Sequence, residues 1–460
     1  MTRNEDDRFT GRVRRVAQVG AGLSSAALAA GANRLMGGAA TDANTARALA
    51  AALGGVKGPL MKVAQMMATI PDLLPPEYAE ELQTLQTNAP PMGASFVKRR
   101  MRAELGPDWR DCFAAFEPEA AHAASLGQVH RATGHDGRAL AVKLQYPDMA
   151  SAVEADLGQL QMILGLFNRA ERSIDTSEMA VEIGARLREE LDYGREAKAM
   201  RLYRAMLTGA EGVRAPEPVE DLSSGRLLTM TWLDGRPITA YRSAPLDVRN
   251  RITTRLFRAW WNPMSAYGVI HGDPHLGNYA VADANGEDEE GSAVNLLDFG
   301  CIRIFPASFV GGVVALYRAL QADDRDGQAA AYRTWGFGDL SGELLDALNL
   351  WARFIYGPLL DDRERTVADG VKPGHYGRRE AFAVREKLKT LGPVRIPREF
   401  VFMDRAAIGL GAAFLHLDAK LNFHRLFEEA IAGFDETAVA ARQADALAAV
   451  GLDDTATPSS

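Results

Sequence analysis

Cysteine is almost absent from the sequence, with only Cys112 and Cys301 in 460 residues. Neither belongs to a C-x-x-C pair, which argues against a zinc site or a redox pair. Such sparing use of cysteine is typical of a reducing compartment. An excess of positive charge is also missing, since the formal net charge is -8. A nucleic-acid partner therefore has no global electrostatic support.

Long hydrophobic runs are missing as well. No window holds the roughly 18 uninterrupted apolar residues of a membrane-spanning helix. Residues 16–36 come closest, but alanine and glycine dominate them, and residues 5–7 are acidic where a signal peptide is basic. We therefore expect neither a transmembrane helix nor a signal peptide, and a cytoplasmic location.

The order of the segments predicts an α+β fold with two lobes. Helical patterns cover residues 41–85, and two strands at 125–132 and 138–146 flank a turn at 134–137. A further strand is expected at 226–233, and the rest is mostly helical except for a hairpin region at 268–303. We expect an Ala/Gly-rich arm (1–40), a helical extension (41–110), a β-rich lobe (111–233), a helical lobe (234–450) and a disordered tail (451–460). A cleft between lobes is a natural ligand site.

The most specific pattern runs from His271 to Asn278 and is followed by a D-F-G tripeptide at 298–300. Asp273 and Asn278 have the spacing of the catalytic loop of kinases. Phosphoryl transfer needs a carboxylate near the attacking group and oxygen ligands that hold Mg²⁺ on the phosphates of ATP. Asp273 fits the first role, and Asn278 with Asp298 fits the second. A tight turn beside a chance tripeptide is the alternative reading.

Lys143 ends the strand sequence L-A-V-K, which is typical of the lysine that contacts nucleotide phosphates and pairs with a helix glutamate. Residues 177–207 are expected to form one helix, on which Asp192 and Glu196 lie four apart and share a face. Of these two carboxylates, Glu196 is the favoured partner of Lys143. Taken alone, such a lysine is usually just exposed.

No G-x-G-x-x-G loop precedes Lys143. An alanine-rich stretch with Ala123, Ala124 and Ser125 stands in its place and is expected to approach the nucleotide. Alanine restricts φ where glycine does not, so altered nucleotide preference or phosphate positioning is expected. In the linker, Met230 and Trp232 are expected to hold the adenine through backbone contacts.

Taken together, these motifs resemble the UbiB/AarF-like atypical kinases, over residues of about 50–420. Lys62-Val-Ala-Gln65 resembles their K-x-G-Q motif, and residues 123–130 resemble their alanine-rich loop. Glu190-Leu-Asp192-Tyr resembles their E-x-D-Y motif, and residues 271–278 and 298–300 match the rest. The resemblance implies a protein-kinase-like fold in which the helix of Lys62 and Gln65 covers the active site, with Lys62 near Glu190 or Asp192 and part of the catalytic set.

The resemblance also implies an ATP- and Mg²⁺-dependent kinase or ATPase that supports ubiquinone biosynthesis rather than protein phosphorylation. A lipid, a phenolic quinone precursor or the inner membrane surface would then be a partner. Ala64, His122, Gly272 and Leu276 depart from the family motifs, and the linker lacks the usual glutamate after Met230. After Gly300 the chain passes through Phe305-Pro306 directly into an apolar helix, so the platform for a peptide substrate is missing.

Two other functions stay open. A small-molecule phosphotransferase of the aminoglycoside or choline kinase type also carries H-G-D-x-x-x-x-N. A nucleotide-dependent lipid-binding module without catalysis would keep the same residues. The sequence does not identify the phosphoryl acceptor, the nucleotide preference or the oligomeric state.

Overall fold

The structure is a computed structural model that describes residues 92–123, 126–154, 157–158, 184–185, 187–282, 292–370, 384, 387 and 397–453. The expectations for Lys62, Gln65, Ala124 and Ser125 lie outside these residues. The chain divides by its contacts into two units. The first holds residues 1–192 and 221–229, and the second holds residues 193–220 and 230–460. The lobe boundaries drawn from the sequence stay a prediction.

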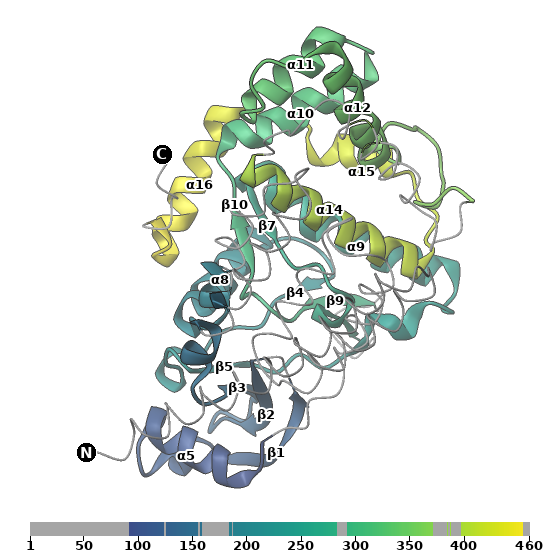
Figure 1. Ribbon diagram of the computed structural model, residues 1–460. Helices are drawn as coiled ribbons and strands as arrows, with labels where there is room; N and C mark the ends of the chain where they lie inside the picture. The colour runs from purple at the N-terminus through teal and green to yellow at the C-terminus, as the bar shows by residue number, and fades with distance from the viewer. Residues whose placement is uncertain are drawn as a thin grey trace, which may run out of the picture. The chain divides into compact units, whose positions relative to one another are not determined.

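The first unit contains a four-stranded sheet in the order β1-β2-β3-β5, formed by Ala115–Ala123, Gly127–Thr133, Ala139–Gln145 and Leu227–Thr231 (Figure 1). β2 and β3 pair antiparallel across the turn that the sequence predicts. The Gly134 amide donates to the Arg138 carbonyl over 2.9 Å, and Gly137 has a φ of 82°. The left-handed conformation at Gly137 is one that glycine adopts without strain. This hairpin prediction is confirmed.

The strand β1 was not predicted. It pairs antiparallel with β2, so that His122 lies opposite Val129 and Ala123 opposite Gln128. His122 and Ala123 are therefore strand residues and not part of a loop. β1 is a mostly exposed edge strand rich in alanine and glutamate, two residues that are depleted in strands. Its residues therefore do not show the pattern that predicts a strand.

Helix α5 (Ala94–Leu105) is fastened to the end of β3 by a buried arginine. Arg100 donates from Nε to the carbonyl of Gln145 over 3.1 Å and from Nη2 to the carbonyl of Tyr146 over 3.3 Å. Its Nη1 bonds Glu104, which also accepts from the hydroxyl of Ser224. These bonds fix the strand that carries Lys143 against the helix.

The predicted helix at 177–207 is interrupted. A helical stretch ends at Glu190, and the chain turns at Leu191 and Asp192, with the Asp192 amide bonded to the Glu189 carbonyl. The helix α8 (Tyr193–Met206) begins only after this turn. Asp192 therefore does not share a helix face with Glu196. An aspartate is favoured just before a helix, where its charge faces the positive end of the helix dipole, and this explains the break.

Helices make up most of the second unit: α8, α9 (Leu246–Tyr267), α10 (Ala307–Gln321), α11 (Arg325–Thr334), α12 (Gly342–Tyr356), α14 (Arg398–Leu417), α15 (Phe423–Ala430) and α16 (Glu436–Val450). α9 is central, because Phe257 packs on Phe414 and Phe423, and Trp261 meets Phe427 edge to face at 4.7 Å. Gly268 ends α9 in the left-handed region with a φ of 64°, and turns the chain into β7.

Two small sheets adjoin these helices. The strands β4 (Val213–Arg214), β9 (Ala293–Leu296), β8 (Tyr279–Ala282) and β6 (Arg236–Pro237) form one sheet in this order. β7 (Val269–His271) pairs antiparallel with β10 (Ile302–Ile304), with His271 opposite Ile302. This pairing sets residues 271 and 301–302 beside each other. As the sequence predicts, α10 follows β10 almost at once.

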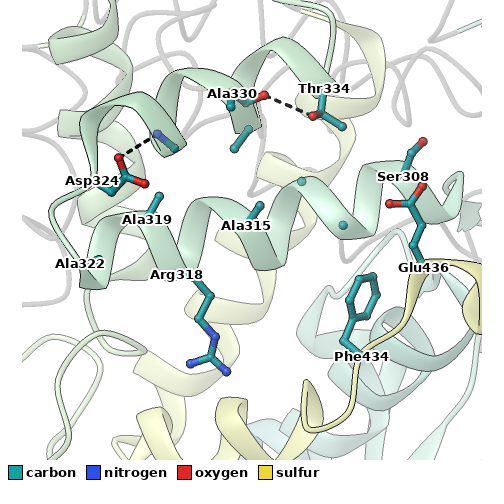
Figure 2. A pocket seen from close by; sticks show the side chains of 14 residues that line it. Ser308, Ala315, Arg318, Ala319, Ala322, Asp324, Ala330, Thr334, Phe434 and Glu436 are labelled. Carbon is teal, nitrogen blue, oxygen red and sulfur yellow. Dashed lines mark hydrogen bonds between the residues drawn. The ribbon is translucent and has the colours of Figure 1, made fainter.

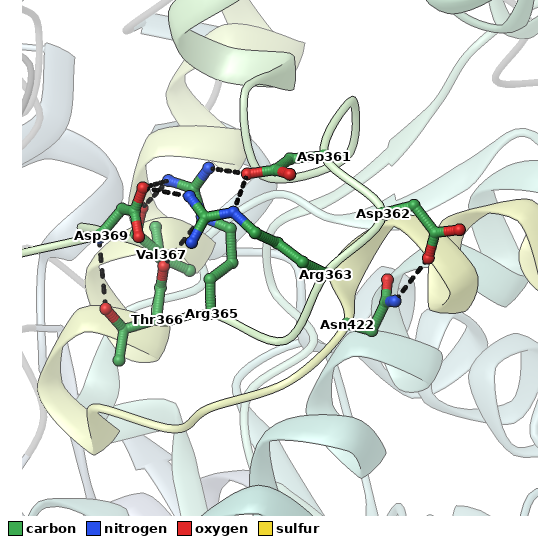
Figure 3. Close-up of polar contacts among 8 residues, drawn as sticks. All are labelled: Asp361, Asp362, Arg363, Arg365, Thr366, Val367, Asp369 and Asn422. Carbon is green, nitrogen blue, oxygen red and sulfur yellow. Dashed lines mark hydrogen bonds and ion pairs between the residues drawn. The ribbon is translucent and has the colours of Figure 1, made fainter.

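A surface loop of the second unit is cross-linked by two arginines and two aspartates (Figure 3). Asp361 accepts from Arg363 and Arg365, each over 2.8 Å, and Asp369 accepts from Arg363. The hydrogen bond from Arg363 lowers the pKa of Asp369 below its ordinary value. The groups are largely paired with one another, so we interpret this loop as a structural element and not as an anion site.

Candidate active site

The loop of residues 271–278, called the motif loop below, starts where β7 ends. The side-chain amide of Asn278 donates to the backbone carbonyl of Asp273 over 2.9 Å and lies 3.4 Å from Asp273 Oδ2. Inside the loop, the Asn278 backbone amide donates to the His275 carbonyl, and His275 Nδ1 accepts from the Gly277 amide. The spacing of five between Asp273 and Asn278 thus closes a compact turn that fixes both side chains.

The D-F-G segment is held next to this loop. The Leu297 amide donates to the Asn278 carbonyl over 3.0 Å, so Asp298 follows directly on a residue bonded to Asn278. Asp298 Oδ1 accepts from the Gly300 amide over 2.9 Å, which orients the carboxylate. The structure therefore brings Asp273, Asn278 and Asp298 together within the second unit.

His271 connects the motif loop to the D-F-G segment. Its Nε2 bonds the backbone carbonyl of Asp298, and its own carbonyl accepts from Trp260 Nε1 over 3.2 Å. Because a carbonyl oxygen can only accept, Nε2 must carry the ring proton. Phe299 packs edge to face against the imidazole at 5.9 Å. The buried histidine is therefore a structural centre for both motifs.

The residues present fit a hard divalent cation. The amide nitrogen of Asn278 is engaged by Asp273, which leaves the amide oxygen as its ligand atom. Together with the carboxylate of Asp298, this gives the oxygen ligands that Mg²⁺ prefers. Among the described residues, no cluster of three or more His, Cys, Asp or Glu side chains could hold a metal ion.

The other predicted site residues are spread over both units. Lys143 is a half-buried residue of β3 in the first unit, and Glu196 is buried in α8 of the second. Their pairing stays a prediction, as do the roles of Glu190, Asp192 and Ala123. Met230 is 6% exposed, and Trp232 Nε1 donates to Asp234 over 2.9 Å. Their contribution to adenine binding also stays a prediction.

Sequence reasoning missed a buried amide–imidazole pair in the first unit. The amide of Gln128 accepts from the Met92 amide over 2.7 Å and donates to the Met92 carbonyl over 3.1 Å. The same nitrogen lies 2.9 Å from His130 Nε2, and His130 Nδ1 lies 2.9 Å from the Glu117 carbonyl. Burial lowers the pKa of His130, which favours a neutral ring with its proton on Nδ1. The motif G-Q-V-H thus has a structural role that its spacing alone did not reveal.

A groove of about 610 Å³ lies elsewhere in the second unit, between α10 and α11 (Figure 2). Gly312, Ala315, Ala319, Ala330 and Ala331 are among the residues that line it. A side chain at Gly312 would meet Trp335 Nε1 at 2.5 Å, so close helix packing explains the small residue there. No residue of the motif loop or the D-F-G segment contributes to this groove.

Three features define a protein-kinase-like protein. They are the sheet that carries the lysine motif, the helical unit, and the motif loop and D-F-G segment that His271 joins. Residues 84–331 match the ABC1 atypical kinase-like domain family, and this stretch is more than half of the chain. The chain belongs to this family, as the resemblance predicts.

Two relatives carry the name atypical kinase. The protein "Atypical kinase coq-8, mitochondrial" of Caenorhabditis elegans is 30% identical over 272 residues, which are 59% of this chain and 36% of that protein. "Atypical kinase COQ8B, mitochondrial" of Rattus norvegicus is 30% identical over 295 residues, 62% of this chain and 53% of that protein. The chain thus matches only about a third to a half of the length of these relatives.

A solved structure shares the fold. Rv3197 of Mycobacterium tuberculosis, in complex with erythromycin, is 26% identical, with a TM-score of 0.57 over 83% of this chain and 94% of that chain. The predicted α+β kinase-like fold is confirmed. In the part of the chain that the structure describes, no helix has the length and apolar character needed to cross a membrane.

Proposed function

We propose that the chain is a Mg²⁺-dependent atypical kinase or ATPase that acts in isoprenoid-quinone (ubiquinone) biosynthesis or in lipid handling. The observation that carries the proposal is the turn in which the Asn278 side chain bonds Asp273 and the Asn278 carbonyl accepts from Leu297, the residue before Asp298. This arrangement supports a role of Asp273 as the carboxylate near the attacking group. It also supports Asn278 and Asp298 as oxygen ligands for a cation on the phosphates of ATP. The names of the COQ8 relatives support the pathway.

Each residue has a distinct part in this proposal. Asp273 would orient the attacking hydroxyl or water and accept its proton. Asn278 and Asp298 would hold Mg²⁺, which neutralises the charge that develops on the phosphates. Lys143 would contact the α- and β-phosphates, and Lys62 would act from the N-terminal extension. A lipid, a phenolic quinone precursor or an anionic membrane surface would stimulate turnover.

The short path from Gly300 to α10 favours this function over protein phosphorylation. Only the strand β10 and its flanking residues separate the D-F-G segment from Ala307, the first residue of α10. A peptide substrate of a protein kinase normally docks on a longer segment that carries the activating phosphosite.

The experiment is ATP hydrolysis by the purified chain, with and without anionic vesicles and a phenolic quinone-precursor mimic. Wild type is compared with Asp273→Asn, Asp298→Asn and Lys62→Ala, and with Asp339→Asn as a charge-matched control at an exposed bend of the second unit. We expect stimulated hydrolysis that Asp273→Asn abolishes and Asp339→Asn leaves intact. Asp298→Asn should also weaken Mg-nucleotide binding.

Other outcomes point to the other functions. Nucleotide binding without turnover under any condition favours the lipid-binding module. Turnover that depends on a water-soluble alcohol and ignores vesicles favours a small-molecule phosphotransferase. Wild-type hydrolysis in Asp273→Asn contradicts the proposed role of this residue.

A further inference from the structure

Three buried polar atoms around the motif loop have no hydrogen-bond partner among the described residues. They are the hydroxyls of Tyr203 and Tyr279 and the Nδ1 atom of His271. The three residues are 0%, 2% and 3% exposed. An unsatisfied buried polar group destabilises a protein by about 1–3 kcal/mol, so three of them close together need a physical reason.

These residues gather around one ring. The ring centres of Tyr203 and Tyr279 each lie 6.2 Å from that of His271, and Tyr203 packs on Phe299 at 5.4 Å. Tyr203 comes from α8, whereas Tyr279 directly follows Asn278 at the start of β8. The cluster therefore lies immediately beside the loop that holds Asp273 in place.

The hydrogen-bonding capacities of the three groups are complementary. His271 Nε2 donates to the Asp298 carbonyl, and in the neutral imidazole the other ring nitrogen, Nδ1, then offers a lone pair to a donor. A tyrosine hydroxyl can donate as well as accept, so Tyr203 and Tyr279 can each donate to an acceptor such as Nδ1 or to a water.

Packing alone does not account for the hydroxyls. Phenylalanine would give the same aromatic contacts with His271 and Phe299 without burying an unsatisfied oxygen. A buried water typically makes about three hydrogen bonds to polar groups of this kind, and such waters are part of a structure. Tyr279 directly follows Asn278, whose side-chain amide donates to the Asp273 carbonyl, so a water bonded to the Tyr279 hydroxyl would lie beside the turn that holds Asp273.

We propose that Tyr203, Tyr279 and Nδ1 of His271 enclose buried water next to Asp273, and that Tyr279 is thereby a positioning residue for Asp273. The positioning role rests on the function proposed above, whereas the water site does not. Water in this place would link the motif loop to α8 by hydrogen bonds in addition to aromatic packing.

Thermal unfolding tests the water site without any assay of activity. Tyr203→Phe and Tyr279→Phe are compared with Tyr332→Phe, because the Tyr332 hydroxyl in α11 is equally buried and also has no partner among the described residues. If water satisfies the hydroxyls, each of the two variants should lower Tm by about 2–4 °C relative to Tyr332→Phe. An unchanged or higher Tm for both overturns the site, since removal of a dry, unsatisfied hydroxyl stabilises the protein.

Steady-state ATP hydrolysis tests the positioning role. Tyr279→Phe should lower kcat about tenfold, which corresponds to about 1.4 kcal/mol, and leave KM for Mg-ATP unchanged. Tyr332→Phe should leave both constants unchanged. An unchanged kcat in Tyr279→Phe overturns the positioning role. If even the wild type does not hydrolyse ATP, the proposed function fails, and the comparison of Tm values still decides on the water site.

Discussion

The backbone of Gly272 lies directly against that of Cys301. Its amide donates to the Cys301 carbonyl over 2.6 Å, and a Cβ atom at Gly272 would lie 2.9 Å from that oxygen. Backbone cannot move aside as a flexible side chain can. Glycine at this position is therefore explained by local packing beside β10, which weakens Gly272 as evidence for a phosphotransferase of the small-molecule type.

This contact predicts that Gly272→Ala destabilises the protein. We expect the free energy of unfolding to fall by about 1–3 kcal/mol, as for other overpacked positions, and ATP turnover to fall with it because the motif loop moves. Gly411→Ala in α14 is the control, since nothing lies within 4 Å of a Cβ atom there. That variant should be neutral or slightly more stable. Equal stability of Gly272→Ala and wild type would contradict the packing argument.

The hydrogen bond between Asn278 and Asp273 leads to a second prediction. Asn278→Asp keeps the shape of the side chain but removes the donor and sets a carboxylate near the Asp273 carboxylate and carbonyl. We expect turnover to fall at least about tenfold, since the loss of a buried bond and the new repulsion together exceed about 1.4 kcal/mol. The dependence of the rate on Mg²⁺ concentration should shift as well.

Asn250→Asp provides the matched control for this variant. The side-chain oxygen of Asn250 accepts from the Lys420 amide over 2.8 Å, a bond that an aspartate also makes. Its turnover should equal that of the wild type. If both variants lose activity to the same degree, added negative charge and not the Asn278 bond is responsible.

The sequence predicted best those parts that depend on local spacing. The turn from Asp273 to Asn278 and the hairpin at Gly134–Gly137 are closed by bonds between residues a few positions apart, so the pattern contains the information. By contrast, the contacts of Tyr203 with His271 and Phe299 join segments that only the tertiary fold brings together. Such residues look like ordinary core aromatics in a sequence, even though Tyr279 stands next to Asn278.

Two errors of the prediction arise where hydrophobic periodicity contains little information. The edge strand β1 has little apolar alternation because most of its residues are exposed. Asp192 interrupts a helical pattern because aspartate is favoured just before a helix start, a preference that periodicity does not detect. Both errors changed the assignment of candidate site residues. His122 and Ala123 became strand residues, and Asp192 left the helix of Glu196.

The buried pair of Gln128 and His130 predicts a loss of stability at mildly acidic pH. Because burial lowers the pKa of His130 in the folded state, the unfolded chain binds a proton more readily. The stabilising contribution of the neutral ring is present above the unfolded pKa of about 6.5 and decreases as the pH falls below it. Protonation would also set two donors against each other between Gln128 Nε2 and His130 Nε2.

Thermal unfolding between pH 7.5 and pH 5 checks this prediction. His130→Phe retains the stacking on Phe116 but cannot titrate, so we expect a lower Tm at pH 7.5 and a flatter decrease with falling pH than in the wild type. His135→Asn is the control, because it removes an exposed histidine from the β2–β3 turn and leaves the buried pair of Gln128 and His130 intact. If His130→Phe and wild type lose Tm in parallel over this range, His130 does not carry the pH dependence, and its bonds to Gln128 and Glu117 contribute equally at every pH tested.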